Sequence, residues 1–333
     1  MNIREQLEEK EEKILSKYAS LSKNSKGRVR FEEPCDMRTI FQRDRDRILH
    51  CKSFRRLKQK TQVFLFPDGD HYRTRMTHTL EVSQIARTIS KAIGLNEDLT
   101  EAIALGHDLG HTPFGHAGER VLNEISSTGF RHNEQSLRVV DKIERDGEGL
   151  NLSFEVRDGI LNHKTSGKPA TLEGQVVQIS DKIAYINHDI DDAIRGGILN
   201  PSDIPRMYTD AIGYTRKERL DSLIHNIIYS SLDKPEIKMR NEVYEAMYGI
   251  RQYLFQNVYT NPKAKSEEKK AKSIIKALYK YFEAHTEMLP TLYLQTVYQE
   301  GIEPAVCDYI AGMTDTFAIK TYKDIFIPKA WRY

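Results

Sequence analysis

The chain has 333 residues, of which 39% are hydrophobic and 29% charged, and its formal net charge is +2. This balance is ordinary for a folded soluble protein, and so small a net charge excludes a nucleic-acid coat or a membrane binder driven by overall charge. An anionic ligand must therefore be recognised by local basic residues. The three cysteines are widely spaced, so no thiolate zinc site and no disulfide framework is expected.

The first 20 residues, rich in Glu and Lys with interspersed Ile and Leu, predict an amphipathic helix too charged to be a signal peptide. No run of about 18 apolar residues could span a bilayer, so we expect a cytoplasmic protein without a membrane partner. Residues 20–40 predict a loop, and residues 44–59 predict a helix with Ile48, Leu49 and Leu57 on its apolar side.

The best strand candidate is 62–66, followed by an expected turn at 67–70. A strong helix is predicted over 77–94, because its apolar residues recur at helical spacing and place His78 on the buried face. The next helix, capped by Asn96, should run through His107.

The pattern stays helical at 172–194 and from about 217 onward, so the expected fold class is all-α. The Lys-rich segment 263–276 is expected to be a solvated linker or helix face. A nucleic-acid-binding patch there is the alternative, and nothing else in the sequence indicates nucleic acid as a partner or regulator.

Histidines are unevenly distributed, since six of the eleven fall between His71 and His132. Carboxylates lie among them, and buried charged groups must be paired or must bind a metal. The His107–Asp108 pair, at the end of an apolar helix, offers an imidazole and a carboxylate that could lean toward one divalent ion. Such a mixed pair does not choose among Mg²⁺, Mn²⁺, Fe²⁺ and Zn²⁺.

Asp181, Tyr185 and Asp189 lie four residues apart along one strip of the predicted helix 172–194. Spacing alone leaves two interpretations open. The strip is either a solvated face, or a metal ligand followed by two groups that hydrogen-bond a bound molecule.

The sequence resembles the HD-domain superfamily of metal phosphohydrolases, whose signature is His … His-Asp … Asp. Within it, the chain is most similar to deoxynucleoside triphosphate triphosphohydrolases of the dGTPase type. The dipeptide alone is a weak signal, but HDLGHTPFGHAGE (107–119) together with RTRMTHTLEV (73–82) is very specific. Further stretches in the same order are FQRDRDRILHCKSFRRLKQKTQVF (41–64), FRHNEQS (130–136), SDKIAYINHDIDDA (180–193) and DYIAGMTD (308–315).

The resemblance implies the roles of individual residues. The implied ligands of one divalent metal ion (Mg, Mn, Fe, Ni or Zn) are His78, His107, Asp108 and Asp181. The implied catalytic residues are the pair His116 and Glu119, with His132 facing the phosphates. The implied substrate-binding residues are Arg75 and Lys182 for phosphate, Gln59, Tyr185 and Asp189 for deoxyribose, and His111 in a phosphate-contacting or supporting role.

The resemblance also implies an all-α HD-domain fold with additional C-terminal helices. The whole chain, 1–333, would form one catalytic domain, with its core at about 45–200 and a helical extension at about 205–333. Related proteins form dimers, tetramers or hexamers, so a homo-oligomer is expected. One departure from the family pattern is Thr316, where the family usually has Arg, and this puts in doubt a regulatory or interface contact at that position.

The implied activity is hydrolysis of a dNTP to a deoxynucleoside and inorganic triphosphate. Two alternatives remain open. The first is another HD-type phosphohydrolase, a 5′-nucleotidase or a cyclic-nucleotide phosphodiesterase. The second is a nucleotide-binding regulator that has lost catalysis, although the complete set of implied ligands and catalytic residues argues against it.

Overall fold

The computed structural model describes residues 1–62, 73–258 and 262–329. Within these ranges the fold is all-α, as predicted, with no strand and two isolated bridges. The helices are α1 (Ile3–Ile14), α2 (Ile40–His50), α3 (Lys52–Arg56), α4 (Arg75–Ala92), α5 (Glu97–Gly106), α6 (Gly115–Ile125), α7 (His132–Arg138), α8 (Phe154–Asn162), α9 (Leu172–Arg195), α10 (Arg206–Ile212), α11 (Arg216–Ser231), α12 (Asn241–Asn257), α13 (Pro262–Ala284), α14 (Thr291–Glu300), α15 (Ile302–Ala311) and α16 (Asp315–Phe326).

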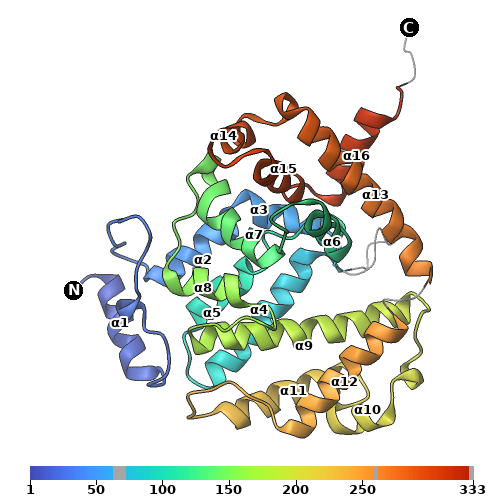
Figure 1. Cartoon of the computed structure of the whole chain (residues 1–333). Coiled ribbons are helices and arrows are strands. Elements are labelled where there is room, and N and C mark those ends of the chain that lie inside the picture. The colour runs from blue at the N-terminus through green and yellow to red at the C-terminus, as the bar shows by residue number, and fades with distance from the viewer. Residues whose placement is uncertain (63–72, 259–261, 330–333) are drawn as a thin grey trace.

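The centre of the molecule is built from α2, α4, α5, α8 and α9, which pack against one another (Figure 1). The helix predicted at 77–94 is α4, and its apolar stripe of Val82, Ile85 and Ile89 is buried as expected. The helix predicted at 172–194 is α9, which runs across the centre of the view and contacts α4, α5 and α8. Two long neighbouring helices, α4 and α9, thus supply the rigid frame of the site described below.

Two further layers cover this centre on opposite sides (Figure 1). Helices α10–α12 pack against one side of α9. Helices α13–α16 form a second hydrophobic cluster that includes buried residues of α6. On α13, Ala271 and Ile275 are buried while Lys269 and Lys270 are exposed, so this part of the Lys-rich segment is a solvated helix face.

The single helix predicted over 44–59 is wrong, because the chain breaks at Cys51. Cys51 is extended, and its sulfur accepts the N–H of Phe54. The carboxylate of Glu144 accepts the N–H groups of Lys52 and Ser53 at 3.0 and 2.7 Å, and so caps a new helix, α3. This cap comes from about 90 residues further along the chain, so local periodicity could not reveal it.

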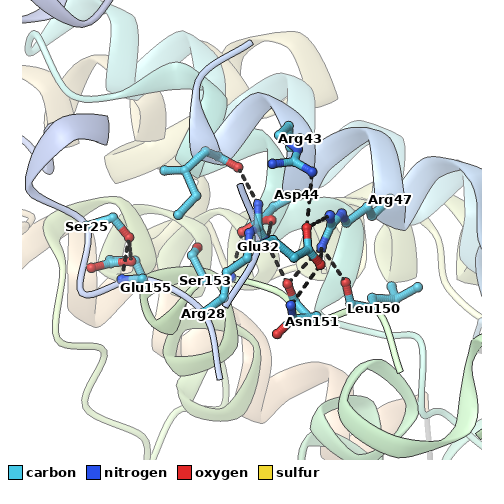
Figure 2. Close-up of polar contacts among 12 residues, drawn as sticks. Ser25, Arg28, Glu32, Arg43, Asp44, Arg47, Leu150, Asn151, Ser153 and Glu155 are labelled. Atoms are coloured by element: carbon cyan, nitrogen blue, oxygen red, sulfur yellow. Dashed lines mark hydrogen bonds and ion pairs between the residues drawn. The ribbon is translucent and has the colours of Figure 1, made fainter. Parts of the chain in front are cut away.

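The segment that precedes α2 is fixed to the centre by charged side chains (Figure 2). Arg28 donates to Asp44 Oδ1 and to the carbonyl of Asn151, each at 2.5 Å. Glu32 pairs with Arg47, which also donates to the Asn151 carbonyl at 2.9 Å. Because Asp44 and Arg28 are almost fully buried, these charge-assisted bonds replace the water that both groups would otherwise need. The expected loop at 20–40 is therefore held in place without regular structure, apart from one short helical turn.

Other predictions have mixed outcomes. The N-terminal helix exists as α1, but it spans only Ile3–Ile14 and buries none of its residues. The expected strand at 62–66 lies outside the described residues except for Gln62, and the expected turn at 67–70 lies wholly outside them. In the described part of the chain, no helix is long and apolar enough to cross a membrane.

Candidate metal centre and active site

The four predicted metal ligands lie on or directly after three helices, and three of them form one cluster that Asp181 borders. His78 lies on the buried face of α4, His107 and Asp108 follow the end of α5, and Asp181 lies on α9. The donor atoms of His78, His107 and Asp108 lie within 4.8 Å of one another. Asp181 Oδ1 lies 3.0 Å from His78 Nε2 and 3.9 Å from His107 Nε2. This arrangement of two imidazoles and two carboxylates could hold a divalent cation.

The hydrogen bonding of His107 supports that interpretation. Its Nδ1 lies 2.7 Å from the carbonyl of Ala104, and a carbonyl can only accept, so the proton is on Nδ1. The other nitrogen, Nε2, is buried and has no hydrogen-bond partner among the described residues. A buried lone pair that faces Asp108 and Asp181 destabilises the fold unless a cation or a hydrogen-bond donor binds to it.

The two carboxylates of the cluster are held in the charged form. Burial alone would raise the pKa of Asp108, but His107 and Arg75 outweigh this effect and hold it well below its ordinary value. For Asp181 burial also opposes ionisation, but its interactions with His78 and His107 outweigh this effect and lower its pKa. Ionised carboxylates are the form that binds a cation.

A positive side chain borders the cluster. Arg75, which is 2% exposed, lies with Nη1 2.5 Å from Asp108 Oδ2. Its backbone N–H donates to the carbonyl of Lys60 at 3.0 Å, which fixes the start of α4. His111 lies nearby, with donor atoms of Asp108, His111 and His132 within 4.8 Å of one another. Burial, and then the charge of Arg75, lowers the pKa of His111 well below its ordinary value, so this ring is neutral.

One carboxylate orients two histidines at the mouth of the site. His116 Nδ1 lies 3.1 Å from Glu119 Oε2, as the one-turn spacing predicted, and the His116 side chain is 66% exposed. Glu119 Oε1 also lies 2.8 Å from His132 Nδ1 and accepts the His132 backbone N–H at 3.0 Å. Burial raises the pKa of Glu119, but its hydrogen bonds with the two rings more than reverse this and lower it far below its ordinary value.

His163 belongs to this cluster but was not predicted from the sequence. Its Nδ1 lies 2.7 Å from the carbonyl of Ile160, and its Nε2 lies 3.2 Å from His132 Nε2. Burial, and then the neighbouring His107 and His132, lowers the pKa of His163 to about 3, so the neutral ring can accept a bond from His132. The signal was present: His163 follows the apolar helix α8 just as His107 follows α5, and each bonds the carbonyl three residues earlier.

The strip on α9 continues away from the predicted metal ligands. Burial lowers the pKa of Lys182 and raises that of Tyr185, whose phenol hydrogen-bonds Arg251 of α12. Asp189 is 2% exposed, and its Oδ1 has no hydrogen-bond partner among the described residues. Burial, and then the nearby Asp192 and Asp181, raises the pKa of Asp189 well above its ordinary value. Arg251 is a second residue that the sequence did not single out.

Gln59 is the predicted residue that the structure connects least to the site. It lies in a short helical turn, Leu57–Gln59, and is exposed. In the described part of the chain, no hydrogen bond joins its side chain to the other predicted residues. Its neighbour Lys60 is buried and donates to the backbone carbonyls of His111 and Ala311.

The C-terminal layer holds the active-site loops through the stretch DYIAGMTD. Asp315 accepts the N–H of Phe114, just before α6, and the N–H of Thr61, each at 2.9 Å. Asp308 accepts from Gln135 and from Arg138 Nε at 2.7 Å, and so anchors α7, which begins at His132. These residues support the loops that carry His116 and His132. Thr316 is exposed at the start of α16.

The helical fold and the His/Asp cluster define an HD-domain phosphohydrolase. Residues 75–186 match the HD domain family, and residues 237–324 match the phosphohydrolase-associated domain. A phosphohydrolase from Bacteroides thetaiotaomicron shares the fold, with a TM-score of 0.53 and 18% identity over 84% of this chain and 67% of that chain.

Curated relatives narrow the family. A deoxyguanosinetriphosphate triphosphohydrolase-like protein from Caldanaerobacter subterraneus is 60% identical over 99% of this chain and 98% of its own length. Another, from Clostridium perfringens, is 49% identical over the full length of both chains. The chain belongs to this family of deoxyguanosinetriphosphate triphosphohydrolase-like proteins.

Proposed function

We propose that the protein is a metal-dependent dNTP triphosphohydrolase, a phosphoric ester hydrolase that cleaves dGTP or several dNTPs to deoxynucleoside and inorganic triphosphate. The observation that carries the proposal is the order of groups along α9. Asp181 lies in the His78–His107–Asp108 cluster, and Tyr185 and Asp189 follow on the same strip. Four residues of helix span about 6 Å, roughly the distance between a deoxyribose and its own α-phosphate.

The order of these groups along α9 indicates how a bound dNTP would be oriented. Tyr185, Asp189 and Gln59 would contact the sugar, and the α-phosphate would lie at the metal ligands. The oxygens of the β- and γ-phosphates would be bound by Lys182, Arg75 and the neutral His111. Arg75 suits this role because its guanidinium is held at the cluster by Asp108 and stays charged.

The bound metal would neutralise charge on the α-phosphate and lower the pKa of an attacking water. His116, oriented by Glu119, would donate or accept the proton at the 5′-oxygen or at that water. Glu119 holds His132 through Nδ1, and the Nε2 of His132, which contacts the neutral His163, would donate to a phosphate oxygen in place of His163 when a dNTP binds.

Further properties remain proposals. One divalent ion per chain (Mg, Mn, Fe, Ni or Zn) would bind His78, His107, Asp108 and Asp181, because the mixed nitrogen and oxygen donors suit all of these metals. We also propose a cytoplasmic homo-oligomer built from one continuous domain, with nucleic acid not indicated as a partner.

A monophosphate nucleotidase or a phosphodiesterase is the alternative within the same fold. The buried, unpartnered Asp189 oxygen and Tyr185 favour a substrate whose sugar is read at that end of α9. The intact Glu119–His116 contact favours an enzyme over a regulator without catalysis.

A sugar comparison tests the proposed orientation. If the Tyr185 ring crowds a 2′-hydroxyl, wild-type protein should hydrolyse dGTP about 10–100-fold more efficiently than GTP, a range typical of shape-based exclusion of one hydroxyl. Tyr185→Ala should reduce that ratio toward one, whereas Tyr185→Phe, which keeps the ring, should preserve it. The measurement is kcat/KM for both nucleotides with each variant. Equal turnover of GTP and dGTP by wild type would remove Tyr185 from this role.

A further inference from the structure

His188 is a buried histidine on α9 that the proposed chemistry does not use. It is 1% exposed and lies behind His78, on the side away from Asp181. Its Nδ1 lies 3.4 Å from His78 Nδ1, and its Nε2 forms an ion pair or hydrogen bond with Glu81 Oε2. Glu81, His188 and His78 therefore form a continuous chain of contacts that ends at the proposed metal ligands.

The contacts of this chain show where its protons would lie with a metal bound. Metal binding through His78 Nε2 requires a lone pair on that nitrogen, so the His78 proton lies on Nδ1, and His188 Nδ1 accepts it. His188 then carries its own proton on Nε2, which faces Glu81, because an ionised carboxylate can only accept. His78 Nε2, which lies 3.0 Å from Asp181 Oδ1, is left free for the ion that the two residues would share.

The residues around Glu81 keep its carboxylate ionised and directed at His188. Burial opposes the charge on Glu81, but the bond with His188 and the charges of Arg73 and Arg216 lower its pKa to about 2. Arg73 Nε and Arg216 Nη2 lie 3.2 and 3.0 Å from the Glu81 oxygens and hold the carboxylate toward His188.

We propose that Glu81 and His188 are positioning residues that hold His78 in the tautomer whose Nε2 is free to bind the metal. The inference rests on the proposed metal centre. His107 reaches the same state by bonding the Ala104 carbonyl. In His78 the corresponding nitrogen faces a side chain instead, so two replaceable residues control it, as supporting residues commonly do for metal-bound histidines.

The first test measures Zn²⁺ affinity of the full-length, metal-stripped protein by competition with a chromophoric chelator. In Glu81→Gln the side chain is neutral and can donate as well as accept, so the opposite tautomer of His188 becomes available. We expect Glu81→Gln and His188→Ala to bind Zn²⁺ about 10–100-fold more weakly than wild type, the usual effect of losing such a support.

Asp191→Asn is the matched control. Asp191 shares Arg73 and Arg216 with Glu81, at 3.5 and 3.4 Å, but among the described residues no side-chain hydrogen bond or ion pair joins it to His188. It should therefore bind Zn²⁺ within about twofold of wild type, although it weakens the same arginine network. An equal loss in Asp191→Asn and Glu81→Gln would mean that the charge network matters and the tautomer does not, which overturns the inference.

The second test reads the tautomers directly, by long-range ¹⁵N–¹H NMR of histidine-labelled, Zn²⁺-loaded protein. Wild type should show the proton of His78 on Nδ1 and that of His188 on Nε2. A proton on Nδ1 of His188, or wild-type Zn²⁺ affinity in Glu81→Gln, would overturn the positioning role but leave the proposed metal centre standing. Zn²⁺ binding by His107→Ala at wild-type strength would instead overturn the metal centre itself, so the two failures are distinguishable.

Discussion

The His107→Ala variant is expected to lose its bound divalent ion and all measurable dNTP hydrolysis while its helices remain intact. The substitution removes the buried Nε2 that faces Asp108 and Asp181, and so leaves the proposed centre one ligand short. Metal content by elemental analysis, turnover of dGTP and circular dichroism would be compared with wild type.

An exposed histidine provides the control for this substitution. His225→Ala replaces the same residue type on α11, where its ring bonds only a carbonyl of its own helix among the described residues and stacks near Tyr229. It should keep full metal content and activity. A stoichiometric ion in His107→Ala, or full activity in metal-stripped wild type, would contradict the proposed centre.

The second large effect is expected for His116→Ala. A general acid–base group contributes about 10²–10⁴-fold in rate, which corresponds to about 3–5 kcal/mol of activation free energy. Because His116 is 66% exposed and His78, His107 and Asp108 form a separate buried cluster, metal content and dNTP binding should survive. The checks are kcat, metal content and the Kd for a non-hydrolysable dNTP analogue.

His285→Ala is the matched control, because the exposed His285 also lies close to a carboxylate, 3.3 Å from Glu287, but that carboxylate is exposed whereas Glu119 is largely buried. It should leave kcat unchanged. If His116→Ala turned over at near wild-type rates, the proton-transfer role would pass to His132, which shares Glu119 with His116.

Periodicity was sufficient for the long helices, because the apolar residues of α4 and α9 recur at helical spacing and are buried. It failed at Cys51, where the helix break depends on Glu144, a residue distant in sequence. Caps supplied by tertiary contacts leave no local pattern, so such boundaries are visible only in the folded chain.

The site residues also divide into those that the sequence predicted and those that only the folded chain reveals. Motifs and family resemblance identified residues that the structure brings together around Asp181 and around Glu119. His163, His188 and Arg251 were not predicted because each acquires its partner only when helices pack, although His188 lies within the quoted stretch 180–193. The reverse holds for Gln59, which the motif singled out but whose side chain has no described contact with the site.

The measurement that tests the proposed function most directly is product analysis by ³¹P NMR. Metal-loaded protein would be incubated with each dNTP, singly and in pairs, and the phosphorus products identified. The order of groups along α9 places the proposed cleavage at the α-phosphorus, so the expected products are intact inorganic triphosphate and a deoxynucleoside. Release of pyrophosphate with dNMP, or of orthophosphate with dNDP, would contradict it.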